Sequence, residues 1–267
     1  MAKIDLKNAT VKLWDGTLGT LTTTNTGGVD GQIILTAKSK HIGSNKIALT
    51  LVDPGEDGSL GVVTTGRSIV ATLAYETGAV TTTATLLAAA IAGNTEANAL
   101  VTVTQAGAGT DLVEAQAITT LDGQQSIDIT VGEGTLSYSE KTPREFVKDR
   151  GNLDTVRDAD QEPMDISFDF IWDFITAESG GSNPTVEEAL KNTGIAVTNS
   201  WLTTALDTCQ PFCVDVELSN LPECSSVEDE YTMFTEFYQE NLDHDAKEGS
   251  VACSGRCNAT TASHTRA

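Results

Sequence analysis

Acidic side chains alternate with large apolar ones in the segment Met164–Asp173. Its two residue sets are Met164, Ile166, Phe168, Phe170 and Trp172 on one side, and Asp165, Ser167, Asp169, Ile171 and Asp173 on the other. A period of two is typical of a strand with one buried face, so the carboxylates would line the other face. A one-residue slip would move aspartates into the core, which fixes the register.

A second segment repeats the pattern. It places Val214, Val216 and Leu218 on one side, and Asp215, Glu217 and Ser219 on the other. Carboxylates held in rows on strands would give a surface a negative potential that repels anions. We therefore predict two half-buried strands whose polar faces are anionic.

Five cysteines form the other group of reactive side chains: Cys209, Cys213, Cys224, Cys253 and Cys257. Two pairs are spaced Cys-x-x-x-Cys, which zinc sites tolerate, although the spacing is less diagnostic than Cys-x-x-Cys. Residues four apart on one strand lie roughly 13 Å apart, so a disulfide would have to cross between strands or lie in turns. Packed thiols, a disulfide and a zinc site all remain open.

Patterns for catalysis are sparse. The chain has three histidines, His41, His244 and His264, and neither a nucleophile elbow nor a phosphate-binding loop. The acids flanking His244 suit a solvated turn better than a cation site, because no further ligands follow at a recognisable spacing. Paired carboxylates for glycoside hydrolysis usually accompany aromatic sugar platforms, and aromatic residues are only 5% of this chain. We expect no catalytic residues, no cofactor and no enzyme.

The net charge of −22 is concentrated in the C-terminal part, where residues 151–267 have 22 Asp and Glu against five Lys and Arg. Such a field opposes binding to phosphate backbones, which requires clustered Lys and Arg. No apolar run is long enough to cross a bilayer, and the N-terminus lacks a basic region followed by an apolar one. We expect a soluble, non-exported protein that is neither a conventional nucleic-acid binder nor a membrane protein.

The abundance of Thr, Val, Ala and Gly favours a mainly β protein. The pattern of residues 4–18 predicts an opening strand or a hairpin that ends at Asp15-Gly16, and a Thr/Gly-rich linker follows at 20–31. Residues 31–123 contain few acids and form a compact unit inserted into another domain. Its predicted strands are 32–37, 46–52, 61–64, 68–74, 100–104 and 115–120, with a helix over 83–92 that stops at Gly93.

The third zone, from residue 124 onward, includes one marked helix. Thr185 and Glu188 match a capping box, Glu187 and Lys191 are four apart, and Gly194 fits a C-terminal cap, so we place a helix at 185–193. Residues 138–150 form a local basic patch that either pairs with a neighbour's acidic edge or is a solvated loop.

Two stretches carry a resemblance to a known family. Residues 129–140, Ile-Thr-Val-Gly-Glu-Gly-Thr-Leu-Ser-Tyr-Ser-Glu, and the run from Arg150 to Trp172 resemble the major tail tube protein of long-tailed, siphovirus-type bacteriophages. The order of a first strand, a long loop, an acidic strand, a short helix and a last stretch at 249–259 is similar too. The resemblance covers residues 1–18 and 124–267, whereas 31–123 resemble a surface module of phage tail proteins.

The resemblance implies a β-sandwich or barrel tail-tube fold with a short α-helix, formed by residues 1–20 and 124–267, plus an inserted small α+β domain, 21–123. It implies hexameric rings that stack into a tube inside the virion tail, assembled in the host cytoplasm, without a membrane. The implied partners are further copies of the chain, the tape-measure protein, the tail terminator, and double-stranded DNA that passes without specific binding. Residues 132–162 would be an arm that reaches the adjacent ring.

An anionic lumen would repel the phosphates of passing DNA. We therefore expect the lumen-facing acids to include Asp165, Asp169, Asp173, Asp215 and Glu217. Two alternatives remain. One is a monomeric carbohydrate- or cell-surface-binding β module, and the other is a tail terminator or the inner tube of a contractile tail.

Overall fold

The computed structural model describes residues 9–41, 43–129, 136–149, 152–171, 184–207, 209–220 and 230–266. The chain is mainly β, as predicted, and it divides into two compact units. Unit 1 comprises Met1–Gly16 and Gln125–Ala267, and unit 2 comprises Thr17–Gln124. The predicted boundary at residue 20 falls inside unit 2, because the segment predicted as a linker begins with a strand, Thr20–Thr22.

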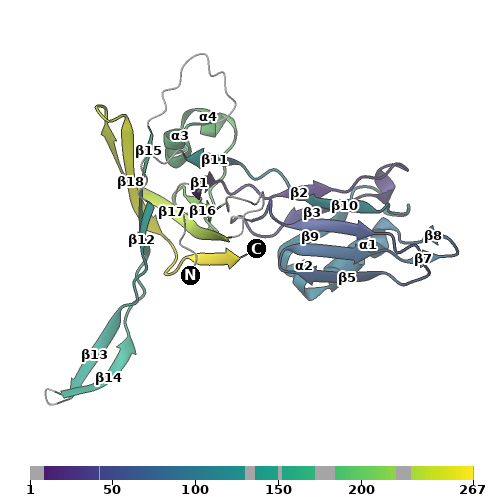
Figure 1. Ribbon diagram of the computed structural model, residues 1–267, viewed down its shortest axis with the longest axis horizontal. Helices are drawn as coiled ribbons and strands as arrows, with labels where there is room; N and C mark the ends of the chain where they lie inside the picture. The colour runs from purple at the N-terminus through teal and green to yellow at the C-terminus, as the bar shows by residue number, and fades with distance from the viewer. Residues whose placement is uncertain are drawn as a thin grey trace. The chain divides into compact units, whose positions relative to one another are not determined.

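Unit 1 contains one eight-stranded sheet of antiparallel neighbours (Figure 1). Its strand order is β11 (Ser126–Ile129), β1 (Ala9–Trp14), β16 (Val214–Asn220), β17 (Glu230–Asp245), β18 (Ser250–Cys257), β15 (Met164–Ile171) and β12 (Leu136–Ser139), and β19 (Ser263–Arg266) pairs with β17. The first half of β17 pairs with β16 and β19, and the second half pairs with β18. A single strand of 16 residues therefore belongs to both halves of the sheet.

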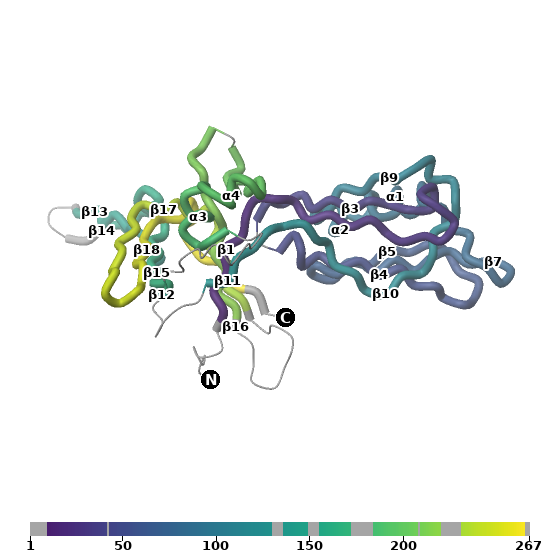
Figure 2. Tube along the Cα trace, turned by 90° about the horizontal axis from the view of Figure 1, so that it is seen from above, coloured from purple at the N-terminus to yellow at the C-terminus, as the bar shows by residue number. Residues whose placement is uncertain are grey.

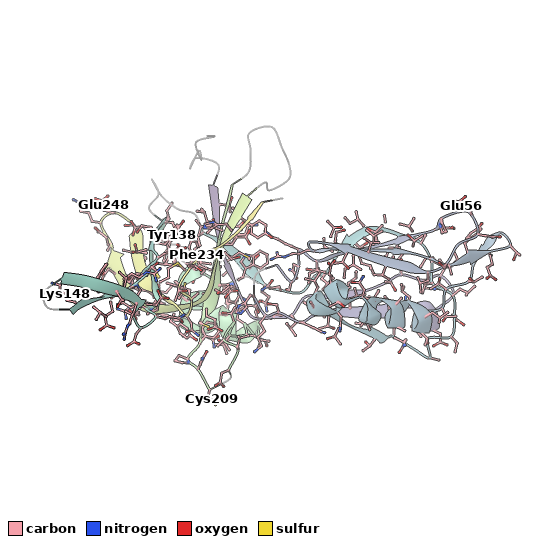
Figure 3. The ribbon with its side chains drawn as sticks, turned by 90° about the horizontal axis from the view of Figure 1, so that it is seen from below. Glu56, Tyr138, Lys148, Cys209, Phe234 and Glu248 are labelled. Atoms are coloured by element: carbon pink, nitrogen blue, oxygen red, sulfur yellow. The ribbon has the colours of Figure 1, made fainter. Side chains whose placement is uncertain are left out.

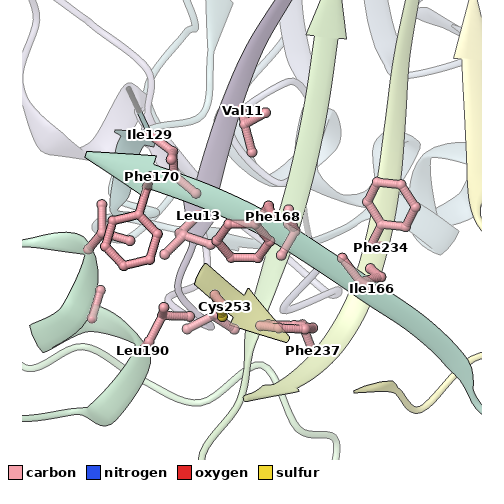
Figure 4. Close-up of a cluster of buried hydrophobic side chains, with 14 of the residues drawn as sticks. Val11, Leu13, Ile129, Ile166, Phe168, Phe170, Leu190, Phe234, Phe237 and Cys253 are labelled. Atoms are coloured by element: carbon pink, nitrogen blue, oxygen red, sulfur yellow. The ribbon is translucent and has the colours of Figure 1, made fainter. Parts of the chain in front are cut away.

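The core of unit 1 lies between these halves (Figure 4). Phe168 from β15, Phe234 and Phe237 from β17, and Leu13 from β1 are fully buried. The rings of Phe168 and Phe237 lie 5.7 Å apart at a tilted angle. Each such side chain contributes roughly 1.5–3 kcal/mol when removed from water, so this cluster accounts for much of the stability of unit 1.

The alternation in the acidic segment is confirmed for the described residues of β15. Met164, Ile166, Phe168 and Phe170 are buried, whereas Asp169 and Ile171 are exposed. At the sheet edge, Tyr138 on β12 extends the apolar side, because its ring meets that of Phe234 edge-on at 5.0 Å (Figure 3). The apolar set thus sets the register of β15 against β12 and β18.

Two short helices cover part of this core. Helix α3 (Val186–Lys191) begins with the predicted capping box of Thr185 and Glu188, and Val186 and Leu190 are buried. The predicted cap at Gly194 is wrong, because Asn192 adopts the left-handed conformation that ends α3. Gly194 instead begins α4 (Gly194–Thr198). No helix among the described residues is long and apolar enough to cross a membrane.

A two-stranded hairpin, β13 (Arg144–Asp149) and β14 (Asn152–Asp158), extends from the sheet next to β12 (Figure 1). It lies within the predicted arm, residues 132–162, and it contains most of the predicted basic patch. Pro143 accepts a backbone hydrogen bond from Ala159 at its base. An isolated two-stranded hairpin is only marginally stable in water, so further contacts would stabilise this one.

Unit 2 is a sandwich of two sheets, which form separate layers in Figure 2. The first sheet has the order β2 (Thr20–Thr22), β3 (Ile33–Ala37) and β9 (Val101–Gln105), and the second has the order β10 (Gln116–Thr120), β4 (Ala48–Val52), β6 (Ser68–Thr72) and β5 (Gly61–Thr65). The pair β7 (Tyr75–Glu76) and β8 (Ala79–Val80) and the 3-10 helix Val29–Gly31 complete its turns. All the strands predicted here are present, with ends shifted by up to two residues.

Helix α1 (Ala84–Gly93) and helix α2 (Thr95–Leu100) contact both β9 and β5. They therefore close the side of the sandwich between these two edge strands. Asn94 joins the helices, caps α2 through its side chain, and donates to the carbonyl of Val62 on β5 at 3.1 Å. The edge of β5 is thus partly occupied by a side chain of its own unit.

We predict that Gly255→Ala destabilises unit 1 by about 1–3 kcal/mol, because a methyl group there would meet the Tyr238 carbonyl and the Phe237 ring where β17 and β18 pack. Gly61→Ala, on an exposed strand with no atom within 4 Å of the added carbon, is the matched control and should leave stability unchanged or slightly higher. Urea unfolding of both variants measures the difference. Equal stabilities would contradict the tight packing.

Candidate functional site

The outer surface of strands β12, β15, β18 and β17 forms a polar face, which we define by four rows of paired residues. Successive rows are Ser139, Asp165, Arg256 and Tyr238; Ser137, Ser167, Ser254 and Asn241; Asp169, Ala252 and Asp243; and Ile171, Ser250 and Asp245. Two of the five predicted lumen acids, Asp165 and Asp169, lie on it. Asp173 lies outside the described residues.

Charge is neutralised at one end of the polar face. Asp165 lies 2.7 Å from the Lys141 ammonium group and 3.3 Å from Arg256. The hydrogen bond from Lys141 is the main cause of a lowered pKa at Asp165, and that bond raises the pKa of Lys141 in turn. Lys141 also contacts Glu162 at 3.5 Å, so the base of the hairpin is joined electrostatically to β15.

The other end of the polar face is acidic. Asp169, Asp243 and Asp245 are all exposed there. The Asn241 amide donates to Asp243 at 2.7 Å, and Asp245 accepts backbone bonds from Lys247 and Glu248 in the β17–β18 turn. Hydroxyl groups occupy the middle, where the Ser137 and Ser167 oxygens lie 2.7 Å apart. The face is therefore mainly hydrophilic, with Ile171 and Ala252 as its apolar members, and its net negative charge lies at one end.

The prediction that Asp215 and Glu217 face outward is wrong. Both side chains are 0% exposed. The strand β16 lies between β1 and β17. Leu206, in the segment that follows α4, donates to the Glu236 carboxylate, and the Glu236 N–H donates to Asp215. Alternation correctly found the apolar side of β16, but it does not reveal that the opposite side is covered as well.

Glu236 is a structural residue that the sequence analysis missed. It is 4% exposed, has a positive φ of 52°, and lies in a bulge where Thr235 and Glu236 together oppose Asp215. Its N–H donates to Asp215 at 2.9 Å, and its carboxylate accepts bonds from Leu206 N–H at 3.1 Å and from Asn258 at 2.6 Å. Phe234 and Phe237, three apart and both buried, are the sequence signal for this bulge.

The cysteines do not form a reactive cluster in the described part of the chain. Cys213, Cys253 and Cys257 are buried thiols and Cys209 is an exposed one, at the loop tip labelled in Figure 3. Burial raises the pKa of Cys253 to about 12, which keeps its thiol protonated. The described residues contain no group of His, Cys, Asp and Glu suited to a metal ion. Cys224 lies outside them.

The acids flanking His244 are also explained without a cation. His244 contacts Glu187 of α3 at 3.3 Å, while Asp243 and Asp245 accept the hydrogen bonds given above. The predicted turn is wrong in place, because Asp243, His244 and Asp245 are the last residues of strand β17 and the turn follows at 246–249. The contact between His244 and Glu187 connects the β17–β18 ribbon to the helix that covers the core.

The hairpin presents an apolar pair to solvent. Phe146 and Val156 are cross-strand partners, 58% and 57% exposed respectively. Charged side chains flank them, including the ion pair between Arg144 and Asp158. Residues 144–158 contain four basic and four acidic residues, whereas unit 1 as a whole is strongly acidic. The hairpin is therefore a charge-balanced segment with an uncovered apolar spot.

Three strands of unit 1 each pair on one side only among the described residues: β11 with β1, β12 with β15, and β19 with β17. Unpaired N–H and C=O groups at such edges are templates for strand addition from another chain. Unit 1 thus combines open sheet edges, a projecting hairpin and a polar face.

Comparisons with protein families, curated proteins and solved structures each found no match to the chain.

We predict that Asp215→Ala lowers the free energy of unfolding by about 1–3 kcal/mol, because it leaves the buried Glu236 N–H without its acceptor. Asp169→Ala, an aspartate on an exposed position of the same sheet, should change it by no more than about 0.5 kcal/mol. Urea unfolding measures both, and Asp215→Asn should retain part of the stability. Equal effects of the two alanine variants would contradict a structural role for Asp215.

Proposed function

We propose that this protein is a self-assembling structural subunit of a bacteriophage tail tube. The observation that carries the proposal is the hairpin β13–β14, which extends from the sheet and exposes the apolar pair Phe146 and Val156. Such a pair is stabilised when a partner covers it, and a second copy of the chain is the partner implied by the sequence resemblance. The hairpin would act as the arm that reaches the adjacent ring.

The open edges of β11, β12 and β19 support the same proposal. Strands added edge to edge around a ring would continue the sheet into a barrel, and closing that barrel would remove the unpaired backbone groups. The hairpin would then link one ring to the next. Each feature belongs to unit 1, so we assign tube assembly to unit 1.

The polar face supports a role as the wall of the passage. Carboxylates at one end of it would repel phosphates, and serine hydroxyls would remain hydrated without attracting a polyanion. We therefore retain Asp165 and Asp169 as proposed lumen residues and add Asp243 and Asp245. Ion pairs with Lys141 and Arg256 neutralise the charge of Asp165. We therefore assign most of the proposed repulsion to Asp169, Asp243 and Asp245.

The monomeric carbohydrate-binding alternative has weaker support. Residues 17–124 contain a single aromatic residue, Tyr75, so unit 2 lacks the stacking platforms that sugar sites usually use. A terminator or contractile inner tube would share the features of unit 1. The length of the assemblies distinguishes a terminator from a tube.

Light scattering and negative-stain electron microscopy of the purified chain, over a range of protein and salt concentrations, test the proposal. Hollow tubes or six-fold rings are the expected result. A chain that stays monomeric in every condition contradicts self-assembly and favours the binding module, for which a glycan screen is the next measurement.

We predict that Phe146→Ser prevents tube formation or raises the critical concentration by roughly tenfold or more, because it removes the apolar contact at the arm. The free energy of unfolding of the monomer should change by no more than about 0.5 kcal/mol, since the side chain is mostly exposed. Phe146→Leu keeps an apolar side chain and should assemble. A serine variant that assembles like the wild type would contradict the role of the arm.

A further inference from the structure

Two short linkers connect the hairpin β13–β14 to the sheet of unit 1 (Figure 1). Residues 140–143 lead from β12 into β13, and residues 159–163 lead from β14 into β15. Among the described residues, a single backbone hydrogen bond joins the two linkers, from the Ala159 N–H to the Pro143 carbonyl at 3.1 Å. This bond closes the hairpin but does not reach the sheet, so backbone pairing does not fix the direction of the hairpin.

Side-chain packing also leaves the second linker little restrained. Gln161, Glu162 and Pro163 are all exposed. A hollow of about 560 Å³ lies between these three residues and the segment 258–261 that follows β18. A segment with few buried contacts moves at little cost in free energy, so the hairpin could change its direction without disturbing the core.

Charged side chains connect the linkers to the sheet instead. Lys141 Nζ in the first linker lies 2.7 Å from the carboxylate of Asp165 on β15 and 3.5 Å from that of Glu162 in the second linker. Arg256 Nε on β18 lies 3.3 Å from Asp165 and 3.6 Å from Glu240 on β17. Five side chains of alternating sign therefore run from both linkers across three neighbouring strands, and we call them the charge network.

The members of the charge network act together. All five side chains are between 36% and 55% exposed, and a single ion pair at such exposure stabilises a protein little. Here Lys141, Asp165 and Arg256 each contact two partners of opposite charge, so that each pair holds a side chain in place for the next. Because the linkers have so few other contacts with the sheet, a modest electrostatic energy is enough to select one direction of the hairpin.

We propose that the charge network is a latch that holds the hairpin in one direction relative to the sheet, and that breaking it lets the hairpin swing about the two linkers. A latched hairpin presents Phe146 and Val156 in a fixed direction, so a partner that covers them does not bear the entropic cost of ordering the hairpin. Salt screens exposed charges, and so the direction of the hairpin depends on ionic strength. The latch belongs to the single chain and does not rest on the proposed function.

The distance between two spin labels, measured by pulsed electron paramagnetic resonance, tests the latch. One label is attached at Glu145→Cys on β13 and the other at Glu248→Cys in the turn between β17 and β18, both exposed positions. Serine replaces Cys209, which is exposed, and Cys224, so that neither takes up a label. A narrow distribution of distances is the expected result for the otherwise unchanged chain.

Asp165→Asn keeps the shape of the side chain and removes its charge. It should widen the distribution by roughly twofold or more, because Lys141 and Arg256 both lose their common partner. Asp169→Asn is the matched control, since it removes an exposed aspartate from the same strand and the same face outside the charge network, and its distribution should stay narrow. Both variants should have the melting temperature of the unchanged chain.

Two further measurements distinguish the latch from a general effect of charge. Lys141→Gln should widen the distribution as Asp165→Asn does, and the double variant should be no wider than Asp165→Asn alone, because both changes break the same contact. In about 1 M NaCl, where charges are screened within about 3 Å, the unchanged chain should approach the width of Asp165→Asn, whose own width should not change.

A distribution that stays narrow in Asp165→Asn overturns the inference. So does one that widens equally in Asp169→Asn, or a double variant that is wider than either single variant. These results are obtained on the single chain, and so they are independent of whether the protein assembles into tubes.

Discussion

The bend of β17 at Glu236 is the feature on which unit 1 depends. Before the bulge the strand pairs with β16 and β19. After it, Phe237 keeps one last pair with Val214 of β16, and from Phe237 onward the strand pairs with β18. One strand can serve two halves of a sheet only if its twist changes locally, and a bulge produces that change. The Asp215 carboxylate fixes the bulge by accepting the Glu236 N–H.

Burying Asp215 and Glu236 costs free energy, because carboxylates lose hydration. Backbone and amide donors offset that cost: Glu236 accepts from Leu206 and Asn258, which come from the segment after α4 and the end of β18. The same carboxylate therefore connects three parts of the chain that are distant in sequence. These two acids are buried, whereas Asp169, Asp243 and Asp245 of the polar face are exposed.

The two units manage their sheet edges in opposite ways. Unit 2 covers its edges with helices and side chains, and unit 1 leaves β11, β12 and β19 each paired on one side among the described residues. An exposed sheet edge carries a risk of uncontrolled association with other chains. This protein leaves such edges in unit 1 and covers them in unit 2, so contacts through strand edges are confined to unit 1. The edges of unit 1 suit the tube assembly that we propose for it.

The sequence by itself determined the mainly β class and most strands of unit 2, because these follow from composition and local periodicity. It also placed the boundaries of unit 2 to within four residues. The capping box at Thr185 followed from local capping chemistry. The sequence also identified the buried face of β15. Only the tertiary structure decided that Asp215 and Glu217 are buried while Asp165 and Asp169 are not. Alternation shows which side of a strand is polar, but whether that side meets water depends on segments packed from elsewhere in the chain.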